Sequence, residues 1–332
     1  MTSLERLNTR LAGKPVDKIP NMNIFMHITA REAGVSYSEY VQDYRKLVEG
    51  NVICAEKYGL DSFCAISDPV RETAAFGAKI IFPENAVPYA EPLITDEFDL
   101  SVLCRFNPLD SPRTLDRVKA CELLRQKAGT DYPVIGWVEG CLAEAADLRG
   151  FGDFLIDLAG EEEYLGDLFE IIFDRQKLFI KAQIDAGADF IGVGNAVASL
   201  IGPNLYQKYG LEYDRAVVAY IHSLGVRAKL HICGDITCLL EMLLRVGPDI
   251  LDIDWKTDFT RTAQIFHGTA TAVSGNINPA GVMLLGNAQQ VRAEVRRCIE
   301  QGNETSLIAG GCEISVNTPD ENILAMDEVL YF

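Results

Sequence analysis

The sequence has few basic residues for its length and no long apolar run. Lys and Arg total 30 against 48 Asp and Glu, which gives a formal net charge of −18. Because no basic patch is available to offset this charge, we expect neither nucleic acid nor an anionic membrane surface as a partner. No apolar run approaches the length needed to span a bilayer, so we expect no membrane-spanning segment.

The sequence also lacks a disulfide framework and a secretory leader. Its nine cysteines are odd in number and scattered without regular spacing, which favours a reducing environment. At the start of the chain, Thr2 and Glu5 have the spacing of a capping box that opens a helix through Leu11, in place of a signal peptide. The sequence therefore predicts a cytoplasmic protein.

The most informative stretch covers residues 226–255. Residues 226–232 form a short, mostly apolar run that is typical of a buried parallel strand, and it ends in His231-Ile232-Cys233-Gly234. Residues 237–246 have the pattern of an amphipathic helix, and a second apolar run begins at Asp249. This order of elements predicts a right-handed βαβ unit, in which chemistry sits where strands end and loops begin.

Three residues have the character of metal ligands. Because alternate residues of a strand point to the same face, His231 and Cys233 can converge on one point. Cys312 follows another short apolar run and two glycines. Three protein ligands with one open position are typical of a catalytic zinc site. The alternative is a buried histidine with two inert core thiols, but the position of the residues at two strand ends favours the metal.

The alternation of short apolar strands with helices over the whole chain predicts a (β/α)8 TIM barrel. An open doubly wound sheet is the alternative, but the sequence has no glycine-rich phosphate loop after its first strand, and residues 192–195 are too short to replace one. We expect a single domain over residues 1–332, with an insertion after the second strand that lies over the mouth of the barrel and contains a hairpin or extended excursion. The predicted strands are 21–26, 62–66, 133–138, 190–194, 226–232, 249–255, 270–274 and 306–309.

A barrel requires functional residues to cluster at the carboxyl ends of its strands. Glu139 is notable because it interrupts an apolar run, and a buried carboxylate needs a partner or a raised pKa. A single Asp or Asn at such a position is more often an Asx turn or a helix cap. The polar residues that follow the predicted strands are His27, Asp68, Glu139, Asn195, His231, Cys233, Asp254, Asn276, Cys312 and Glu313.

Three segments of the chain resemble a known family. Residues 137–150, the His231-Ile232-Cys233-Gly234 run and the Gly310-Gly311-Cys312-Glu313 run are similar to the uroporphyrinogen decarboxylase superfamily, and within it to the cobamide-dependent methyltransferase branch. Members of that branch use a His-x-Cys pair and a distant Cys as zinc ligands. The true decarboxylases carry an arginine-rich segment near the N-terminus, whereas residues 23–34 here contain only Arg31.

The resemblance implies methyl transfer between a corrinoid and a small acceptor. A thiol bound at the open zinc position would be deprotonated and aimed at the methyl group. In this scheme Glu139 orients the substrate, moves a proton or serves as a further metal ligand. Asp68, Asn195 and Asp254 contact the corrinoid or the acceptor. We expect methylcobalamin or a separate corrinoid protein to carry the methyl group to a thiol-like acceptor, while transfer to a reduced corrinoid stays open.

Two other functional classes also remain open. A cofactor-free decarboxylase of the same superfamily would use Asp68 with Arg31 or Arg71 and would not respond to chelators. A binding module for zinc or a corrinoid would bind methylcobalamin without removing its methyl group. Metal content and the absorbance change on demethylation of methylcobalamin distinguish these classes.

Overall fold

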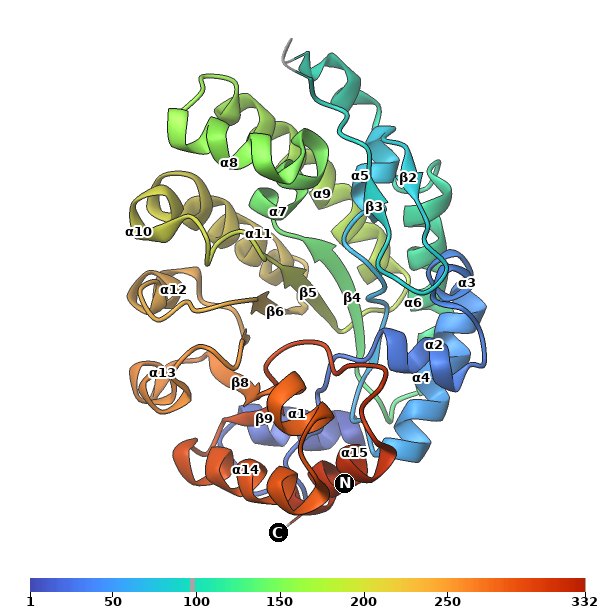
Figure 1. Cartoon of the computed structure of the whole chain (residues 1–332), viewed down its shortest axis with the longest axis vertical. Coiled ribbons are helices and arrows are strands. Elements are labelled where there is room, and N and C mark those ends of the chain that lie inside the picture. Colours follow the sequence, from blue (N-terminus) through green and yellow to red (C-terminus); the bar gives the residue numbers. More distant parts are fainter. Residues whose placement is uncertain (96–98, 332) are drawn as a thin grey trace.

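The computed structural model describes residues 1–95 and 99–331, and a curled parallel sheet lies at the centre of this part of the chain (Figure 1). The seven strands pair in the order β1-β4-β5-β6-β7-β8-β9, so neighbours in the sheet are also consecutive along the chain. This order, with helices between the strands, is what repeated βαβ units produce. The strands are β1 (Phe63–Cys64), β4 (Val134–Glu139), β5 (Phe190–Gly194), β6 (Arg227–Ile232), β7 (Ile250–Ile253), β8 (Ala272–Ile277) and β9 (Leu307–Gly310).

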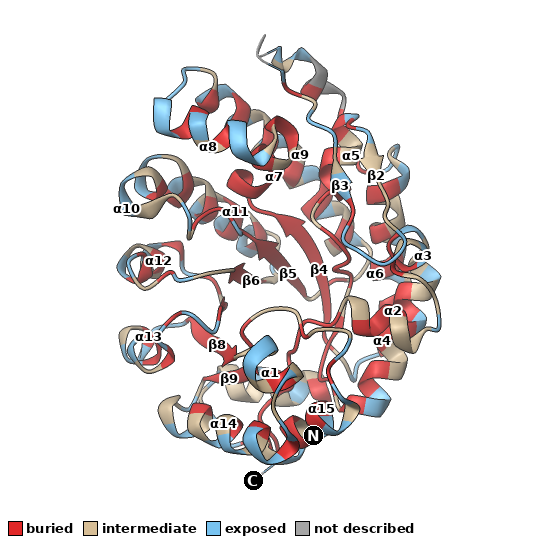
Figure 2. Cartoon of the chain, in the orientation of Figure 1, coloured by how far each residue is buried: buried red, intermediate tan, exposed pale blue. Residues whose placement is uncertain are grey.

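Helices surround the sheet and bury its outer face (Figure 2). They are α1 (Ser3–Leu11), α2 (His27–Glu32), α3 (Tyr37–Gln42), α4 (Tyr44–Tyr58), α5 (Arg71–Phe76), α6 (Pro112–Ala128), α7 (Cys141–Arg149), α8 (Phe151–Gly160), α9 (Leu165–Asp185), α10 (Gly202–Leu205), α11 (Leu211–Ser223), α12 (Leu240–Val246), α13 (Phe259–Phe266), α14 (Ala288–Gln301) and α15 (Asp320–Val329). A 3₁₀ helix, η1 (Leu100–Arg105), and two π-helical segments, η2 (Tyr206–Gly210) and η3 (Pro279–Leu284), complete them. Within the described residues, no helix combines the length and the apolar character needed to cross a membrane.

The prediction of an α/β fold with a parallel sheet is confirmed, but the predicted count of eight sheet strands is wrong. Residues 21–26 form no strand, and residues 21–25 of this segment are buried. Side-chain contacts replace ladder bonds here: the backbone N–H of Asn21 donates to Asp61 Oδ2, the Asn21 side-chain amide donates to Asp327 Oδ1, and the Gly310 N–H donates to Asn23 Oδ1. Short polar side chains commonly compete with backbone pairing in this way.

Of the two forms expected for the insertion, a hairpin or an extended excursion, residues 77–90 contain the hairpin, because β2 (Ile80–Ile81) pairs antiparallel with β3 (Tyr89–Ala90). Residues 37–58 form two helices, α3 and α4, because Asp43 between them adopts an extended conformation and caps α4 through its side chain. At the N-terminus, the capping box of Thr2 and Glu5 is confirmed.

The sheet carries the site because its interior is closely packed and its strands are parallel. Every residue of β4, β5, β7, β8 and β9 is buried. Since parallel strands end at the same edge, the loops that follow β4, β5, β6 and β9 open on the same side of the sheet (Figure 1). Residues far apart in the sequence therefore meet there.

Candidate active site

The strand register aligns polar residues in one row across the sheet. Glu139 on β4 is opposite Gly194 on β5, Gly194 is opposite His231 on β6, and His231 is opposite Asp252 on β7. Neighbours in a parallel ladder project to the same face, so the side chains of this row all point inward. The local sequence did not reveal the row, because it depends on how separate strands are aligned.

His231 is oriented by the carboxylate beside it. Its Nδ1 lies 3.0 Å from Asp252 Oδ2, and its Nε2 lies 3.2 Å from Cys233 Sγ. Although burial acts in the opposite direction, Lys229 and His231 hold the pKa of Asp252 at about 2, so this carboxylate is ionised. A carboxylate on one ring nitrogen leaves the other to serve as a metal ligand. Asp252 is a site residue that the sequence analysis missed.

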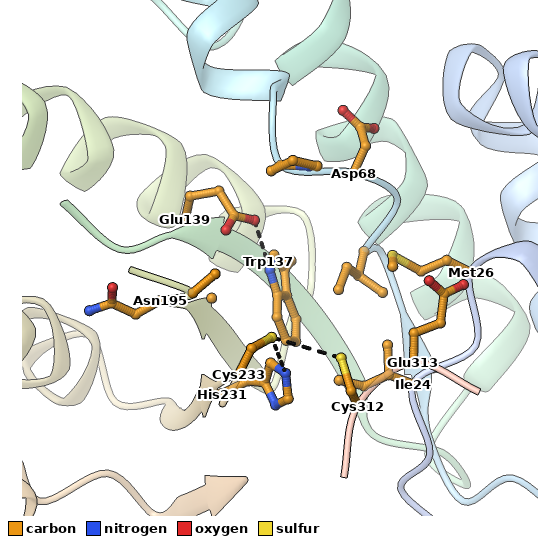
Figure 3. Close-up of a pocket in the computed structure, with 14 residues that line it drawn as sticks. Ile24, Met26, Asp68, Trp137, Glu139, Asn195, His231, Cys233, Cys312 and Glu313 are labelled. Carbon is orange, nitrogen blue, oxygen red and sulfur yellow. Dashed lines mark hydrogen bonds between the residues drawn. The ribbon is translucent and has the colours of Figure 1, made fainter. Parts of the chain in front are cut away.

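His231, Cys233 and Cys312 come together as predicted, with ligand atoms that all lie within 4.8 Å of one another (Figure 3). The Sγ atoms of Cys233 and Cys312 are 3.8 Å apart. Two sulfurs on a tetrahedral zinc ion, each at about 2.3 Å from it, would be about 3.8 Å apart. The hydrogen bond from Cys312 and the charge of His231 lower the pKa of Cys233 to about 4, which favours a thiolate. One imidazole and two thiols therefore fit a soft-to-borderline cation.

Close backbone approach brings Cys312 to the other two ligands. A Cβ at Gly311 would lie 2.2 Å from the backbone nitrogen of Trp255, so only glycine lets the chain after β9 pass there. Asp254 secures the same region, since its carboxylate accepts from the backbone N–H groups of Gly234 and Lys256, both at 3.0 Å. Asp254 does not line the cavity beside the ligands. Its place in the structure is that of a loop anchor next to Cys233.

The ligands open into a cavity of about 170 Å³ (Figure 3). Its floor is the Trp137 ring, which lies across β5 because that strand has glycine opposite it: a Cβ at Gly192 would be 2.1 Å from Trp137 Cε3. Ligand pockets for drug-sized molecules measure about 300–1,000 Å³, so this cavity takes only a small molecule. The cavity is lined by Ile24, Met26, Ile66, Asp68, Pro69, Trp137, Glu139, Gly194, Asn195, Ala196, His231, Cys233, Cys312 and Glu313.

Glu139 lines this cavity and is nine-tenths buried. Its Oε1 accepts from Arg71 Nη2 at 2.9 Å and from Trp137 Nε1 at 3.2 Å. Burial raises the pKa of Glu139 well above its ordinary value, against the opposing charge of Arg71 and with the help of nearby Glu72. A carboxyl group of this kind can exchange a proton near neutral pH. The fully buried guanidinium of Arg71 is thus the charged partner of the Glu139 carboxyl group.

Asp68 and Asn195 also line the cavity, but most of their polar atoms are engaged elsewhere. Asp68 Oδ2 accepts from Arg113 Nη2 at 2.5 Å, and despite burial Arg113 and Arg71 lower the pKa of Asp68. The Asn195 amide donates to both carboxylate oxygens of Asp214 at 3.0 Å. Asn195 Oδ1 is buried and accepts no hydrogen bond from any residue that the structure describes. These two residues are rigidly held parts of the wall.

Two lining residues, Trp137 and Glu313, received no role in the sequence analysis. The signal for Trp137 was present: glycines two residues apart on the next strand leave room for a large side chain on one face. Glu313 faces the cavity, while His27 contacts its Oε1 through both the backbone N–H and the ring Nδ1, at 2.8 and 2.9 Å. His27 and Asn276 themselves do not line the cavity.

The chain is similar in sequence and in structure to several known proteins. The methylcobamide:CoM methyltransferase MtbA of Methanosarcina mazei is 27% identical over 335 residues, which cover 98% of this chain and 97% of that protein. The uroporphyrinogen decarboxylase of Syntrophotalea carbinolica is 25% identical over 93% of this chain and 92% of that protein. A solved structure of a methyltransferase from Methanosarcina mazei, 23% identical, has the same fold, with a TM-score of 0.85 and coverage of 99% of this chain and 98% of that one. A model of the family described as uroporphyrinogen decarboxylase (URO-D) matches residues 2–331. Because this match spans nearly the whole sequence, the chain belongs to the uroporphyrinogen decarboxylase family.

Proposed function

We propose that this protein is a zinc-dependent methyltransferase that moves a methyl group between a corrinoid and a small thiol. The observation that carries the proposal is the convergence of His231, Cys233 and Cys312 on one point at the edge of a small cavity. Three ligands of this type leave one position for a substrate sulfur. A bound zinc ion would lower the pKa of that sulfur and hold it as a thiolate.

The residues around the ligands have separate tasks in this proposal. Asp252 fixes His231 so that its Nε2 faces the two cysteines. Glu139 Oε2 takes the proton that the thiol loses, because Oε1 is engaged by Arg71 and Trp137 and the pKa of Glu139 is raised by burial. Asp68 and Asn195 contact the acceptor or the corrinoid from the cavity wall. Asp254 anchors the loop of Cys233, because its carboxylate accepts the Gly234 N–H.

The size of the cavity supports a separate carrier for the corrinoid. A space of about 170 Å³ admits a small thiol but no corrinoid ring, so the ring covers the mouth of the cavity and only the methyl group points inward. Exposed apolar side chains in the loops after β5, β7 and β8 support a partner on that side: Leu200, Trp255 and Leu285. We propose that a cytoplasmic corrinoid protein presents the methyl group there.

The two alternative classes receive less support from the arrangement of charges. A decarboxylase for a polycarboxylate substrate needs free cations, but Arg71 is fully buried against Glu139. Arg31 contacts Asp320 and the carbonyl of Val316 and does not line the cavity. A binding module without catalysis needs no carboxyl group with a raised pKa beside the ligands. We propose transfer from the corrinoid to the thiol, because an open metal position is suited to activating a nucleophile.

The experiment combines metal analysis with a methyl-transfer assay. We expect one zinc per chain by elemental analysis, and loss of that zinc in His231→Ala and Cys312→Ser. The zinc-loaded protein mixed with methylcobalamin and a panel of thiols should change the cobalamin absorbance and yield a thioether. Cys238→Ser is the control, because Cys238 is exposed and outside the ligand set.

Each class of result identifies one function. Full zinc content in Cys312→Ser would remove Cys312 from the site. Methyl transfer only from a methylated amine or ether to a reduced corrinoid would reverse the direction. Carbon dioxide release from a porphyrinogen, with methylcobalamin inert, would replace the methyltransferase by a decarboxylase. Binding of methylcobalamin without demethylation under any condition would leave a binding module.

A further inference from the structure

Apart from the proposed metal ligands, the ionisable side chains on the cavity wall are all acidic. The wall includes the carboxylates of Asp68, Glu139 and Glu313, and it contains no Lys or Arg. Arg113 pairs with Asp68 and Arg71 pairs with Glu139, so two of the three charges are balanced from behind the wall. The charge of Glu313 has no such cation within the described residues, because its contact there is His27.

The open hydrogen-bonding positions on the wall are acceptors. Glu313 Oε1 is occupied by the two nitrogens of His27, whereas Glu313 Oε2 has no hydrogen-bond partner in the described part of the chain. The side-chain donors on the wall are already engaged, since Trp137 Nε1 donates to Glu139 and the Asn195 amide donates to Asp214. A ligand that fills this cavity must therefore bring its own donor to Glu313.

The remaining wall is apolar and aromatic. Ile24, Met26 and Ile66 line the cavity together with the Trp137 ring, and in the view of Figure 3 Glu139 and Glu313 lie on either side of that ring. An aromatic face is favourable for a cation, and apolar side chains suit a short alkyl chain. Glu313 directly follows the ligand Cys312, so a sulfur at the metal and a head group at Glu313 are separated by only a few atoms.

From these contacts we infer that the thiol substrate carries a protonated amine, which binds at Glu313 Oε2 over the Trp137 ring. The inference rests on the proposed function and specifies its acceptor as a small aminothiol. A thiol with a sulfonate or carboxylate tail would place a second anion beside the carboxylate of Glu313 and find no free side-chain donor among the lining residues. The cavity thus selects its substrate by charge.

The test compares three thiols that share a two-carbon backbone and differ in charge. Cysteamine is cationic, mercaptoethanol is neutral and mercaptoethanesulfonate is anionic at neutral pH. Calorimetric titration of the metal-loaded protein with their S-methyl derivatives measures binding without any methyl transfer. We expect the cation to bind about tenfold or more tightly than the anion, since a hydrogen bond to a charged group contributes that much. The same order is expected for the rates with methylcobalamin.

Glu313→Gln tests the residue, because it keeps the shape of the side chain and removes its charge. We expect this variant to lose most of the preference for the cation, while Glu300→Gln, which removes one exposed charge from α14, keeps it. The ligand series on the unaltered protein remains a test even where the variant folds poorly. Equal or tighter binding of the anionic derivative overturns the inference.

The outcomes also separate this inference from the proposed function. If the anionic thiol is methylated fastest, methyl transfer stands and the aminothiol is wrong. If no thiol removes the methyl group from methylcobalamin but the cation preference depends on Glu313, the cation site stands and the proposed function is wrong.

Discussion

At the scale of single residues, the site depends on side chains that are fixed from behind. His231 is held by Asp252, Glu139 by Arg71, and Asn195 by Asp214. Each pair is buried, so side-chain motion that would blur the geometry is restricted by packing and by charge. In metal sites, the residues that hold the ligating side chains in place affect metal affinity and activity.

The carboxylate behind His231 gives a direct prediction. Asp252→Asn should lower the zinc affinity by about 10–100-fold, the usual effect of changing the partner of a ligating histidine. Competition with a chromogenic chelator measures this affinity. The matched control is Asp249→Asn, since Asp249 makes a similar contact with His222 at 2.8 Å on the surface. An unchanged zinc affinity in Asp252→Asn would show that the Asp252 carboxylate is not needed to orient the His231 ring.

Glu139 gives the second prediction. Glu139→Gln keeps a side chain of the same shape beside Arg71 and Trp137 but cannot accept a proton, so turnover should fall by about 10²–10⁴-fold. Zinc content and the melting temperature should stay close to those of the unaltered protein. Unfolding of the variant, with normal turnover in the molecules that remain folded, would identify Glu139 as a structural anchor.

A buried carboxyl group next to the site gives a prediction about pH. Burial raises the pKa of Glu144 well above its ordinary value, and Glu72 and Asp147 add to the effect. Below the unfolded pKa, both states hold the proton and Glu144 does not affect the pH dependence. As the pH rises above it, the unfolded chain releases the proton while the folded chain keeps it, so stability falls. Glu144→Gln should therefore raise the melting temperature more at about pH 8 than at about pH 4. A pH-independent difference would contradict this reasoning.

At the scale of elements, strand β5 shapes the site by what it lacks. Its two glycines face β4 and leave room for the Trp137 ring and for the Glu139 carboxylate, which a Cβ at Gly194 would meet at 2.7 Å. The glycines of residues 192–194, a run too short for a phosphate loop, therefore make room for side chains of β4. Larger side chains at Gly192 and Gly194 would occupy the space of the Trp137 ring and the Glu139 carboxylate.

This view of β5 leads to the fourth prediction. Gly192→Ala should destabilise the protein by about 1–3 kcal/mol, the usual cost of overpacking a core. The ring would also be displaced, and tryptophan fluorescence should report it. Gly152→Ala in α8 is the control: a Cβ there meets nothing within 4 Å, so it should stabilise by about 0.4–1 kcal/mol. Equal stability of the two variants would show that Trp137 is free to move.

The elements also show what the sequence predicts and what it does not. Strands β4 to β9 were predictable because buried parallel strands are short apolar runs, and the convergence of His231, Cys233 and Cys312 was predictable because they end such runs. The failure at residues 21–26 came from Asn21 and Asn23, whose side-chain amides replace ladder bonds with contacts that are remote in sequence. Asp252 could not be predicted, because its place beside His231 depends on the strand register. Asp254 was predicted as a contact residue, whereas backbone N–H groups occupy its carboxylate.

At the scale of the whole molecule, the two ends of the chain are joined. The Ile19 N–H donates to the Leu330 carbonyl at 2.8 Å, and buried Lys18 pairs with Asp327 at 2.7 Å and with Asp61 at 3.2 Å. These contacts support the proposal of one domain over residues 1–332, because an early segment and the last helix complete the same core.

A thermal measurement tests this proposal together with the metal. One domain should unfold in a single transition, and zinc at 100 times its dissociation constant should stabilise it by about 2.7 kcal/mol, since ligand binding favours the folded state. A chelator should reverse the shift, and His231→Ala should show none. Two separate transitions would argue for two domains, and a zinc effect that persists in His231→Ala would place the metal elsewhere.

One of the three proposed ligands is far from the other two along the chain. His231 and Cys233 leave the ribosome together, but Cys312 follows Cys233 by 79 residues. A chain interrupted between Cys233 and Cys312 holds two of the three proposed ligands, which are too few for a zinc site, and lacks the helix α15 that contacts the N-terminal segment. We therefore expect a variant truncated before Cys312 to retain less zinc than the full sequence.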